Sequence, residues 1–133
     1  MRLVIDANVV VQACIEEVGL GRLAGHELVC PPIMASEVVS SLHEMLYRGE
    51  ISAELAGTAF NRFTALAYDT LNPAELWQLA WDLAQELGWA KTYDAEYVAL
   101  ARLLRCPLVT LDARLARGAS RMADVVGVAD LPA

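Results

Sequence analysis

Apolar and polar residues follow one another in short blocks along the chain, and the block lengths are those of strands and helices. The run 3–5 is apolar, rich in β-branched side chains and followed by Asp6, which predicts a buried strand over 2–6. A block with helical spacing follows at 9–18, and we expect Gly19 and Gly21 to end that helix. A buried strand followed at once by a helix is the repeating unit of α/β proteins.

The same alternation continues to the end of the chain. Further strands are expected at 27–30, 67–71, 106–111 and 124–128. Helices are expected at 33–48, 53–66, 73–87, 93–104 and 113–119, with Ser52 as an N-cap and Gly88 as a stop. We therefore expect one domain over 1–133, of the α/β class, with a parallel sheet covered by helices on both faces.

Composition adds an expectation about surroundings and partners. The chain is 56% hydrophobic with a mean hydropathy of +0.38. No apolar run approaches the ~18 residues that span a bilayer, and the start lacks the features of a signal peptide. We expect a cytoplasmic protein that does not enter a membrane. Its apolar excess predicts a homodimer or a partner protein, because monomers rarely expose large apolar patches.

Charge is distributed unevenly. The net charge of −7 argues against broad affinity for nucleic acid. Residues 91–121, however, contain six basic and three acidic residues. Ordinary solvated helix faces explain such a bias equally well. The three cysteines and two histidines match no zinc pattern and leave little material for a Ser-His or Cys-His nucleophile.

Four carboxylates are candidates for one site. Asp6 and Asp112 each follow a predicted strand, and parallel strands end at the same edge of a sheet. Asp94 opens the helix 93–104, and Glu37 lies early in the helix 33–48. Converging carboxylates repel one another, and a hard divalent cation removes that conflict. Oxygen ligands without histidine or cysteine favour Mg²⁺ or Mn²⁺, which suit phosphodiester hydrolysis.

Each candidate also has a structural interpretation. Asp6 and Asp112 are suitable helix caps, and Asp94 fits the first turn of a helix, where the dipole favours an acid. Glu37 fits a solvated helix face. Thr110, which alternates with apolar strand residues, fits a simply buried position. Glu44, Asp69 and Glu96 are interpreted as structural or exposed, and Tyr93 and Tyr97 as core residues rather than a base-stacking platform.

Four segments carry a resemblance to a known family. They are Val4-Ile5-Asp6-Ala7-Asn8, Ser36-Glu37-Val38, the string from Tyr93-Asp94 to Ala101, and the string from Leu108 through Thr110 and Asp112 to Leu115. In order and spacing they resemble the signature segments of PIN domains, in particular VapC-type toxins of type II toxin–antitoxin systems. The resemblance covers essentially the whole chain. It implies a PIN-like fold with about five parallel strands.

The resemblance also implies a function. It implies a Mg²⁺- or Mn²⁺-dependent endoribonuclease, silenced by a cognate antitoxin that occupies the cleft, and usually a homodimer. It implies that Asp6, Glu37, Asp94 and Asp112 are the metal-binding and catalytic set, with Asn8 and Thr110 as supporting polar groups. The resemblance further implies that a metal-activated water attacks the RNA phosphodiester and leaves a 5′-phosphate. Some relatives carry a further acid soon after the third aspartate, and Glu96 is the nearest one here.

The basic bias of 91–121 then acquires a possible role. Arg114, Arg117 and Arg121 recur at spacings of three and four residues directly after Asp112. If the helix persists past Gly118, they form one basic face beside the cleft, and we hypothesise that they bind RNA phosphates. Two alternatives remain open: a non-catalytic PIN-fold interaction module, and a haloacid-dehalogenase-like phosphatase. The second needs an aspartate where this chain has Asn8.

Overall fold

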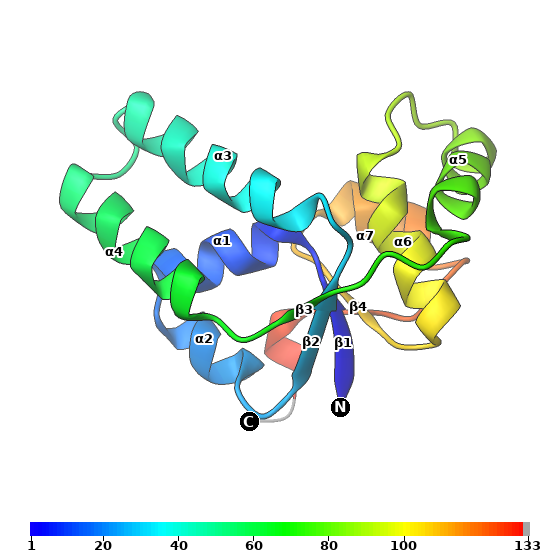
Figure 1. Cartoon of the computed structure of the whole chain (residues 1–133), viewed down its shortest axis with the longest axis horizontal. Coiled ribbons are helices and arrows are strands. Elements are labelled where there is room, and N and C mark those ends of the chain that lie inside the picture. Colours follow the sequence, from blue (N-terminus) through cyan, green and yellow to red (C-terminus); the bar gives the residue numbers. More distant parts are fainter. Residues whose placement is uncertain (132–133) are drawn as a thin grey trace.

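The computed structural model describes residues 1–131 and contains one five-stranded sheet (Figure 1). The strand order is β3-β2-β1-β4-β5, and every pair is parallel. The strands are β1 (Arg2–Ile5), β2 (Glu27–Cys30), β3 (Asp69–Thr70), β4 (Leu108–Val109) and β5 (Val125–Val126). The predicted α/β class, the parallel sheet and the number of strands are confirmed.

Helices cover both faces of this sheet. Figure 1 shows α1 to α4 on one side and α5 to α7 on the other. The helices are α1 (Ala7–Ile15), α2 (Val18–Leu23), α3 (Met34–Tyr47), α4 (Ala53–Ala65), α5 (Leu76–Leu87), α6 (Tyr93–Leu104), α7 (Ala113–Ala119) and the 3₁₀ turn η1 (Val128–Asp130). Across residues 1–131, none of the helices combines the length and apolar character needed to cross a membrane.

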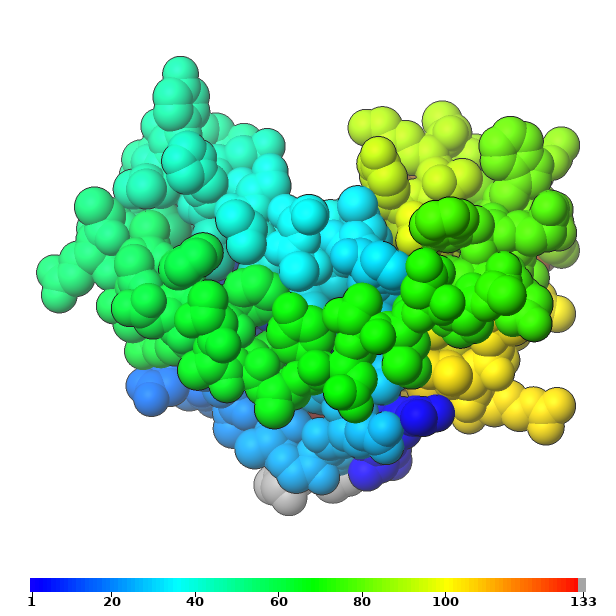
Figure 2. Space-filling view, viewed as in Figure 1, coloured from blue at the N-terminus to red at the C-terminus, as the bar shows by residue number. Residues whose placement is uncertain are grey.

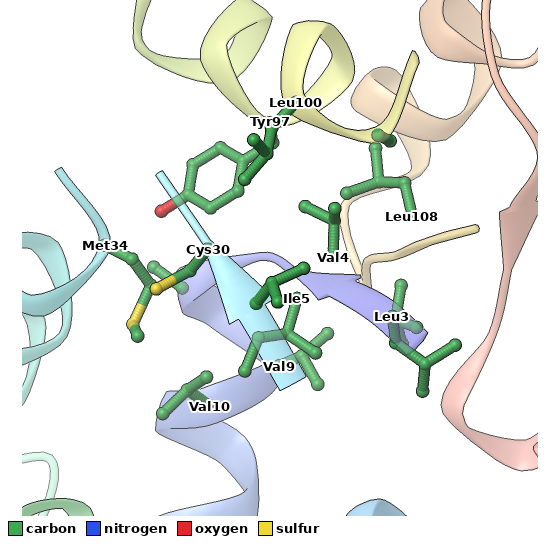
Figure 3. Packing of buried hydrophobic residues seen from close by; sticks show 14 of the residues in the cluster. Leu3, Val4, Ile5, Val9, Val10, Cys30, Met34, Tyr97, Leu100 and Leu108 are labelled. Carbon is green, nitrogen blue, oxygen red and sulfur yellow. The ribbon is translucent and has the colours of Figure 1, made fainter. Parts of the chain in front are cut away.

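Strand β1 is the centre of the core. Its residues 3–5 are fully buried, with Val9 and Val10 of α1 on one side and Tyr97 and Leu100 of α6 on the other (Figure 3). Complete burial of each such side chain stabilises the fold by about 1.5–3 kcal/mol. This packing explains why the first strand lies in the middle of the sheet, although the chain begins with it.

Pairing of β1 with β4 brings together two segments that lie far apart in the sequence. Ile5 lies opposite Val109, and the Asp6 amide donates to the Val109 carbonyl at 3.0 Å. The residues that follow these two strands are Asp6 and Thr110. Both therefore emerge at the same edge of the sheet, which is the edge where open α/β sheets hold ligands.

Two predicted helix boundaries were wrong. The first helix ends at Ile15, and Gly19 and Gly21 lie inside α2. A Cβ at position 19 would stand 2.8 Å from the Ala13 Cα, so Gly19 permits two helices to approach closely rather than ending one. Helix α5 begins at Leu76, not at the proline, because the Leu76 amide first closes a turn onto the Pro73 carbonyl at 3.0 Å. The bounds of α6 and α7 were predicted correctly.

Candidate active site

The four candidate carboxylates come from four elements and approach one another at the carboxyl edge of the sheet. Asp6 follows β1, Asp112 follows β4, Glu37 is in the first turn of α3, and Asp94 is in the first turn of α6. Their charges are close enough to interact, because Asp94 and Glu37 raise the pKa of Asp6, and Asp112 raises that of Asp94. Figure 2 shows the molecule hollowed between α3 and the segment 88–94.

Asp6 is the most deeply placed of the four. Its residue is 5% exposed, and its carboxylate Oδ2 accepts a 2.7 Å hydrogen bond from the Thr110 hydroxyl. Burial, more than the neighbouring carboxylates, raises its pKa from the ordinary 3.8 to about 6. Its position is that of an N-cap for α1, but its side chain makes no capping bond. Helix capping therefore does not explain this aspartate.

Glu37 is held by a residue that sequence reasoning assigned to the core. The Tyr97 hydroxyl donates to Glu37 Oε1 at 2.5 Å, and Figure 3 shows that hydroxyl pointing towards the start of α3. Tyr97 is fully buried, as predicted. Burial and the Asp94 charge raise the pKa of Glu37. Glu37 is half-buried in the cleft, so the solvated-face interpretation was wrong; no sequence signal links residues 60 positions apart.

Asp94 is paired with a cation. Its Oδ2 lies 3.0 Å from Arg114 Nη2, and the Arg114 guanidinium also lies over the Trp89 ring, 5.6 Å from the ring centroid. Burial and the Asp112 charge raise the pKa of Asp94, and the Arg114 charge opposes them. The cation–π contact between Arg114 and Trp89 was not anticipated from the sequence.

Asp112 does cap a helix. Its Oδ1 accepts from the amides of Arg114 at 2.9 Å and Leu115 at 3.1 Å. The N-cap interpretation is therefore correct for this residue, although the Asp112 charge also acts on Asp94. Capping is compatible with a functional role, because the two amide hydrogen bonds fix the Asp112 side chain and keep its charge in one place.

Asn8 and Thr110 bind the loop that carries Asp112. Asn8 Oδ1 accepts from the Leu111 amide at 3.3 Å, and Thr110 Oγ1 accepts from the Asp112 amide at 3.0 Å. Thr110 is 6% exposed, so it is both buried and bonded to Asp6. These two side chains thus hold the ends of β1 and β4 in register around the carboxylates.

The arginines do not form the single helical face that their spacing predicts. Helix α7 ends at Ala119, so Arg114 and Arg117 lie on it and Arg121 lies beyond it. Arg121 lines a different pocket, together with Arg102 and Arg105. After the helix, the Ala119 carbonyl accepts from the amides of Met122 at 2.8 Å and Ala123 at 2.9 Å, so the chain turns over 119–123. The expectation that the helix persists past Gly118 far enough to include Arg121 was therefore wrong.

Glu96 is a fifth carboxylate near the site. Only 8% of the residue is exposed, so it is not a surface acid. Burial and the Glu37 charge raise its pKa, while the Trp77 indole opposes that shift. It lies two residues after Asp94 on α6. The sequence indicated a structural or exposed position for this acid, and in the structure it is buried.

The donor chemistry of the site fits a hard divalent cation. Carboxylate oxygens from four elements, with hydroxyl and amide oxygens beside them, are the ligands that Mg²⁺ and Mn²⁺ prefer. The mutual raising of carboxyl pKa values is the conflict that such an ion relieves. As the side chains stand in residues 1–131, however, no three acidic, histidine or cysteine groups converge tightly enough to hold a metal ion.

The fold and these segments define a known class. Residues 3–120 match the family model of the PIN domain. The structure of PAE2754 from Pyrobaculum aerophilum is similar, with a TM-score of 0.72 and 17% identity over 97% of this chain and 90% of that one. VapBC2 from Rickettsia felis, bound to a DNA fragment from their promoter, gives 0.68 and 15% over 96% and 98%. The chain therefore belongs to the PIN domain family.

Sequence similarity extends to one branch of that family. The chain is 32% identical over 115 residues to ribonuclease VapC9 of Mycobacterium tuberculosis, which covers 85% of this chain and 87% of that protein. The resemblance to VapC-type PIN domains, first drawn from four short segments, is confirmed.

Proposed function

We propose that this chain is a divalent-metal-dependent endoribonuclease and the toxin of a VapBC-type toxin–antitoxin pair. The observation that carries the proposal is the meeting of Asp6, Glu37, Asp94 and Asp112 at one edge of a PIN-domain sheet. The similarity to a VapC ribonuclease supports RNA as the substrate.

In this mechanism the four carboxylates would hold the ion, and hydroxyl groups orient two of them. Thr110 fixes the orientation of Asp6, and Tyr97 fixes that of Glu37. When bound, a divalent cation neutralises charge on the phosphate and makes a water nucleophilic at neutral pH. The water oxygen bonds to phosphorus as the P–O3′ bond breaks, which leaves a 3′-hydroxyl and a 5′-phosphate.

Arg114 has two roles in the proposed mechanism. In the structure its guanidinium neutralises part of the Asp94 charge. A guanidinium has more N–H donors than the one bonded to Asp94, so Arg114 would also be able to contact an RNA phosphate. Both partners of the pair are partly exposed, so opening it costs at most about 1 kcal/mol.

The test is cleavage of single-stranded RNA by the whole chain. We expect cleavage with Mg²⁺ or Mn²⁺ and none with EDTA. Asp6→Asn and Asp94→Asn are expected to lower the rate by about 100-fold or more, equivalent to about 3 kcal/mol in the barrier. Asp69→Asn, an exposed acid at β3, is the matched control and should cleave at the wild-type rate. Activity that survives EDTA or Asp6→Asn overturns the proposal.

We propose a cognate antitoxin and a second copy of the chain as protein partners. The similar solved structures include VapBC2 of Rickettsia felis, and this chain exposes large apolar side chains that a partner would cover. Tyr47 is 86% exposed, and Trp77 and Trp81 are 65% and 63% exposed. Light scattering of the purified chain, alone and with its antitoxin, tests both partners. A monomer that an antitoxin neither binds nor inhibits contradicts them.

A further inference from the structure

A pocket of about 410 Å³ opens beside the carboxylates, between α3 and the segment that leads into α6. This is the hollow between these elements in Figure 2. Its walls include two carboxylates, two aromatic rings and two cations, contributed by Glu37, Asp94, Trp89, Tyr93, Lys91 and Arg114. The volume lies within the range of about 300–1,000 Å³ that small-ligand pockets occupy.

The two tyrosines of α6 have separate environments. Tyr97 is fully buried, as a core residue should be, but Tyr93, one turn earlier, is 50% exposed and lines the pocket. The expectation that both belong to the core was wrong for Tyr93. A half-exposed ring beside a phosphodiester site is the usual platform on which single-stranded nucleic acid stacks a base.

Trp89 packs against α7 and holds Arg114 in place through a cation–π contact. The Trp89 indole packs so closely against α7 that a Cβ at position 118 would lie 2.6 Å from Trp89 Cζ2. The Arg114 guanidinium, one turn earlier on the same helix, also lies over the Trp89 ring in the cation–π contact. Gly118, the indole and the guanidinium thus pack together as one group, the Trp89 stack. The stack ends at the mouth of the pocket, next to Asp94.

The cations that line the pocket are opposite in sign to the net charge of the chain. The whole protein carries −7, which repels an RNA backbone at long range. Lys91 and Arg114 line this pocket directly beside the proposed catalytic carboxylates. Two cations within reach of one site suffice to bind a phosphate group, and an adjacent ring supplies affinity for the base that follows it.

We propose that this pocket binds the nucleotide next to the scissile phosphate, with its base on Tyr93 and its phosphate between Lys91 and Arg114. Trp89 is a positioning residue that acts through Arg114. The inference rests on the proposed ribonuclease function and adds to it the place where one nucleotide of the substrate is held.

The test uses Trp89 as its own reporter. In a Trp77→Phe/Trp81→Phe variant, Trp89 is the sole tryptophan, and this variant is the parent with which the other variants are compared. Titration with a short single-stranded RNA in EDTA should change Trp89 fluorescence. Tyr93→Ala should weaken binding about tenfold, and Tyr93→Phe should change it little, because stacking is worth about 1–3 kcal/mol per base. An abasic strand should bind the parent variant as weakly as RNA binds Tyr93→Ala.

Salt dependence separates the phosphate contacts from stacking. Lys91→Ala should lower the slope of log affinity against log salt by about 0.7, the loss of one phosphate contact on a single strand. Trp89→Leu should lower the slope by a similar amount by misplacing Arg114, and Trp89→Phe should restore it. A role for Trp89 in stability alone would leave the slope unchanged.

The outcomes distinguish the pocket from the catalytic proposal. RNA cleavage by the wild type, combined with unchanged affinity in Tyr93→Ala or a silent Trp89, overturns the pocket and leaves the ribonuclease. RNA binding with the expected pattern, in a chain that fails to cleave with Mg²⁺ or Mn²⁺, supports the pocket and overturns the ribonuclease.

Discussion

The four carboxylates of the site fall into two pairs that are held by different kinds of donor. The inner pair, Asp6 and Glu37, accepts from the neutral hydroxyls of Thr110 and Tyr97. The outer pair consists of Asp94, which faces the guanidinium of Arg114, and Asp112, which accepts backbone amides at the start of α7.

A neutral donor orients a carboxylate without cancelling its charge. Burial raises the pKa of Asp6 to about 6 although the Thr110 hydrogen bond opposes the rise; burial also raises the pKa of Asp94, and there the charge of Arg114 opposes it. The inner pair thus has no positive partner among these contacts. In the outer pair, Asp94 has a positive partner, and in the proposed function this is the side of the cleft that exchanges protein contacts for substrate contacts.

The strongest test of this difference compares the direction in which two matched substitutions change the free energy of unfolding. Without metal at pH 8, Asp6→Asn should raise the free energy of unfolding by on the order of 2–3 kcal/mol, because it removes a buried charge whose pKa is raised. Asp94→Asn should lower it by at most about 1 kcal/mol, because it breaks a partly exposed ion pair. Urea unfolding in EDTA measures both. Two changes of the same sign contradict the comparison.

The dependence of stability on pH should carry the same signature. The Asp6 carboxyl titrates near 3.8 when unfolded and near 6 when folded, so the unfolded state binds fewer protons between these values. Its effect on stability is absent below about pH 4 and grows unfavourable as pH rises to about 6. The difference in unfolding free energy between wild type and Asp6→Asn should therefore widen over that window in EDTA. A constant difference contradicts the raised pKa.

Removal of one neutral donor gives a smaller effect. Tyr97→Phe should lower the free energy of unfolding by about 1–1.5 kcal/mol and raise the pKa of Glu37 further, because a half-buried carboxylate loses its hydroxyl partner. Urea unfolding gives the first quantity, and NMR titration of the glutamate carboxyls gives the second. Wild-type values of both mean that Tyr97 does not support the inner pair.

The smallest expected effect compares two glycines in helices. Gly118→Ala places a methyl group against Trp89 and should lower the free energy of unfolding by about 1 kcal/mol, despite the higher helix propensity of alanine. Gly57→Ala on α4 meets no neighbouring atom within 4 Å and should raise it by about 0.5–1 kcal/mol. Thermal unfolding of the two variants, measured together, checks the difference. Equal changes exclude a tight Trp89 stack.

The parts of the fold that local chemistry specifies could be predicted from the sequence. Helix α4 begins after Ser52, whose side chain accepts from the Leu55 amide, and α5 ends at Gly88 in the left-handed conformation. The places of β1 and β4 in the chain follow from short apolar runs, and with them the shared edge of Asp6 and Asp112, although β4 ends at Val109 and not at the predicted residue 111. Such signals lie within a few residues of the feature that they specify.

The partners of the site residues could not be predicted in the same way. Tyr97 and Trp89 look like ordinary apolar positions in the sequence, and only the tertiary structure brings Tyr97 to Glu37 of α3 and Trp89 to Arg114 of α7. The end of α1 was misplaced for a related reason, since Gly19 is required by a contact with Ala13 and not by its own turn. The family resemblance identified the carboxylates, but the donors that orient them depend on tertiary structure.

The pairing of β1 with β4 also has a consequence for synthesis of the protein on the ribosome. Asp6 meets its hydroxyl partner Thr110 only after 104 further residues have been added. At roughly 5–20 residues per second, several seconds pass between the synthesis of β1 and the synthesis of β4, its neighbour in the sheet. A nascent chain that ends before Asp112 has no complete site. An enzyme that we propose to cut RNA thus lacks a complete site until Asp112 has been added to the chain.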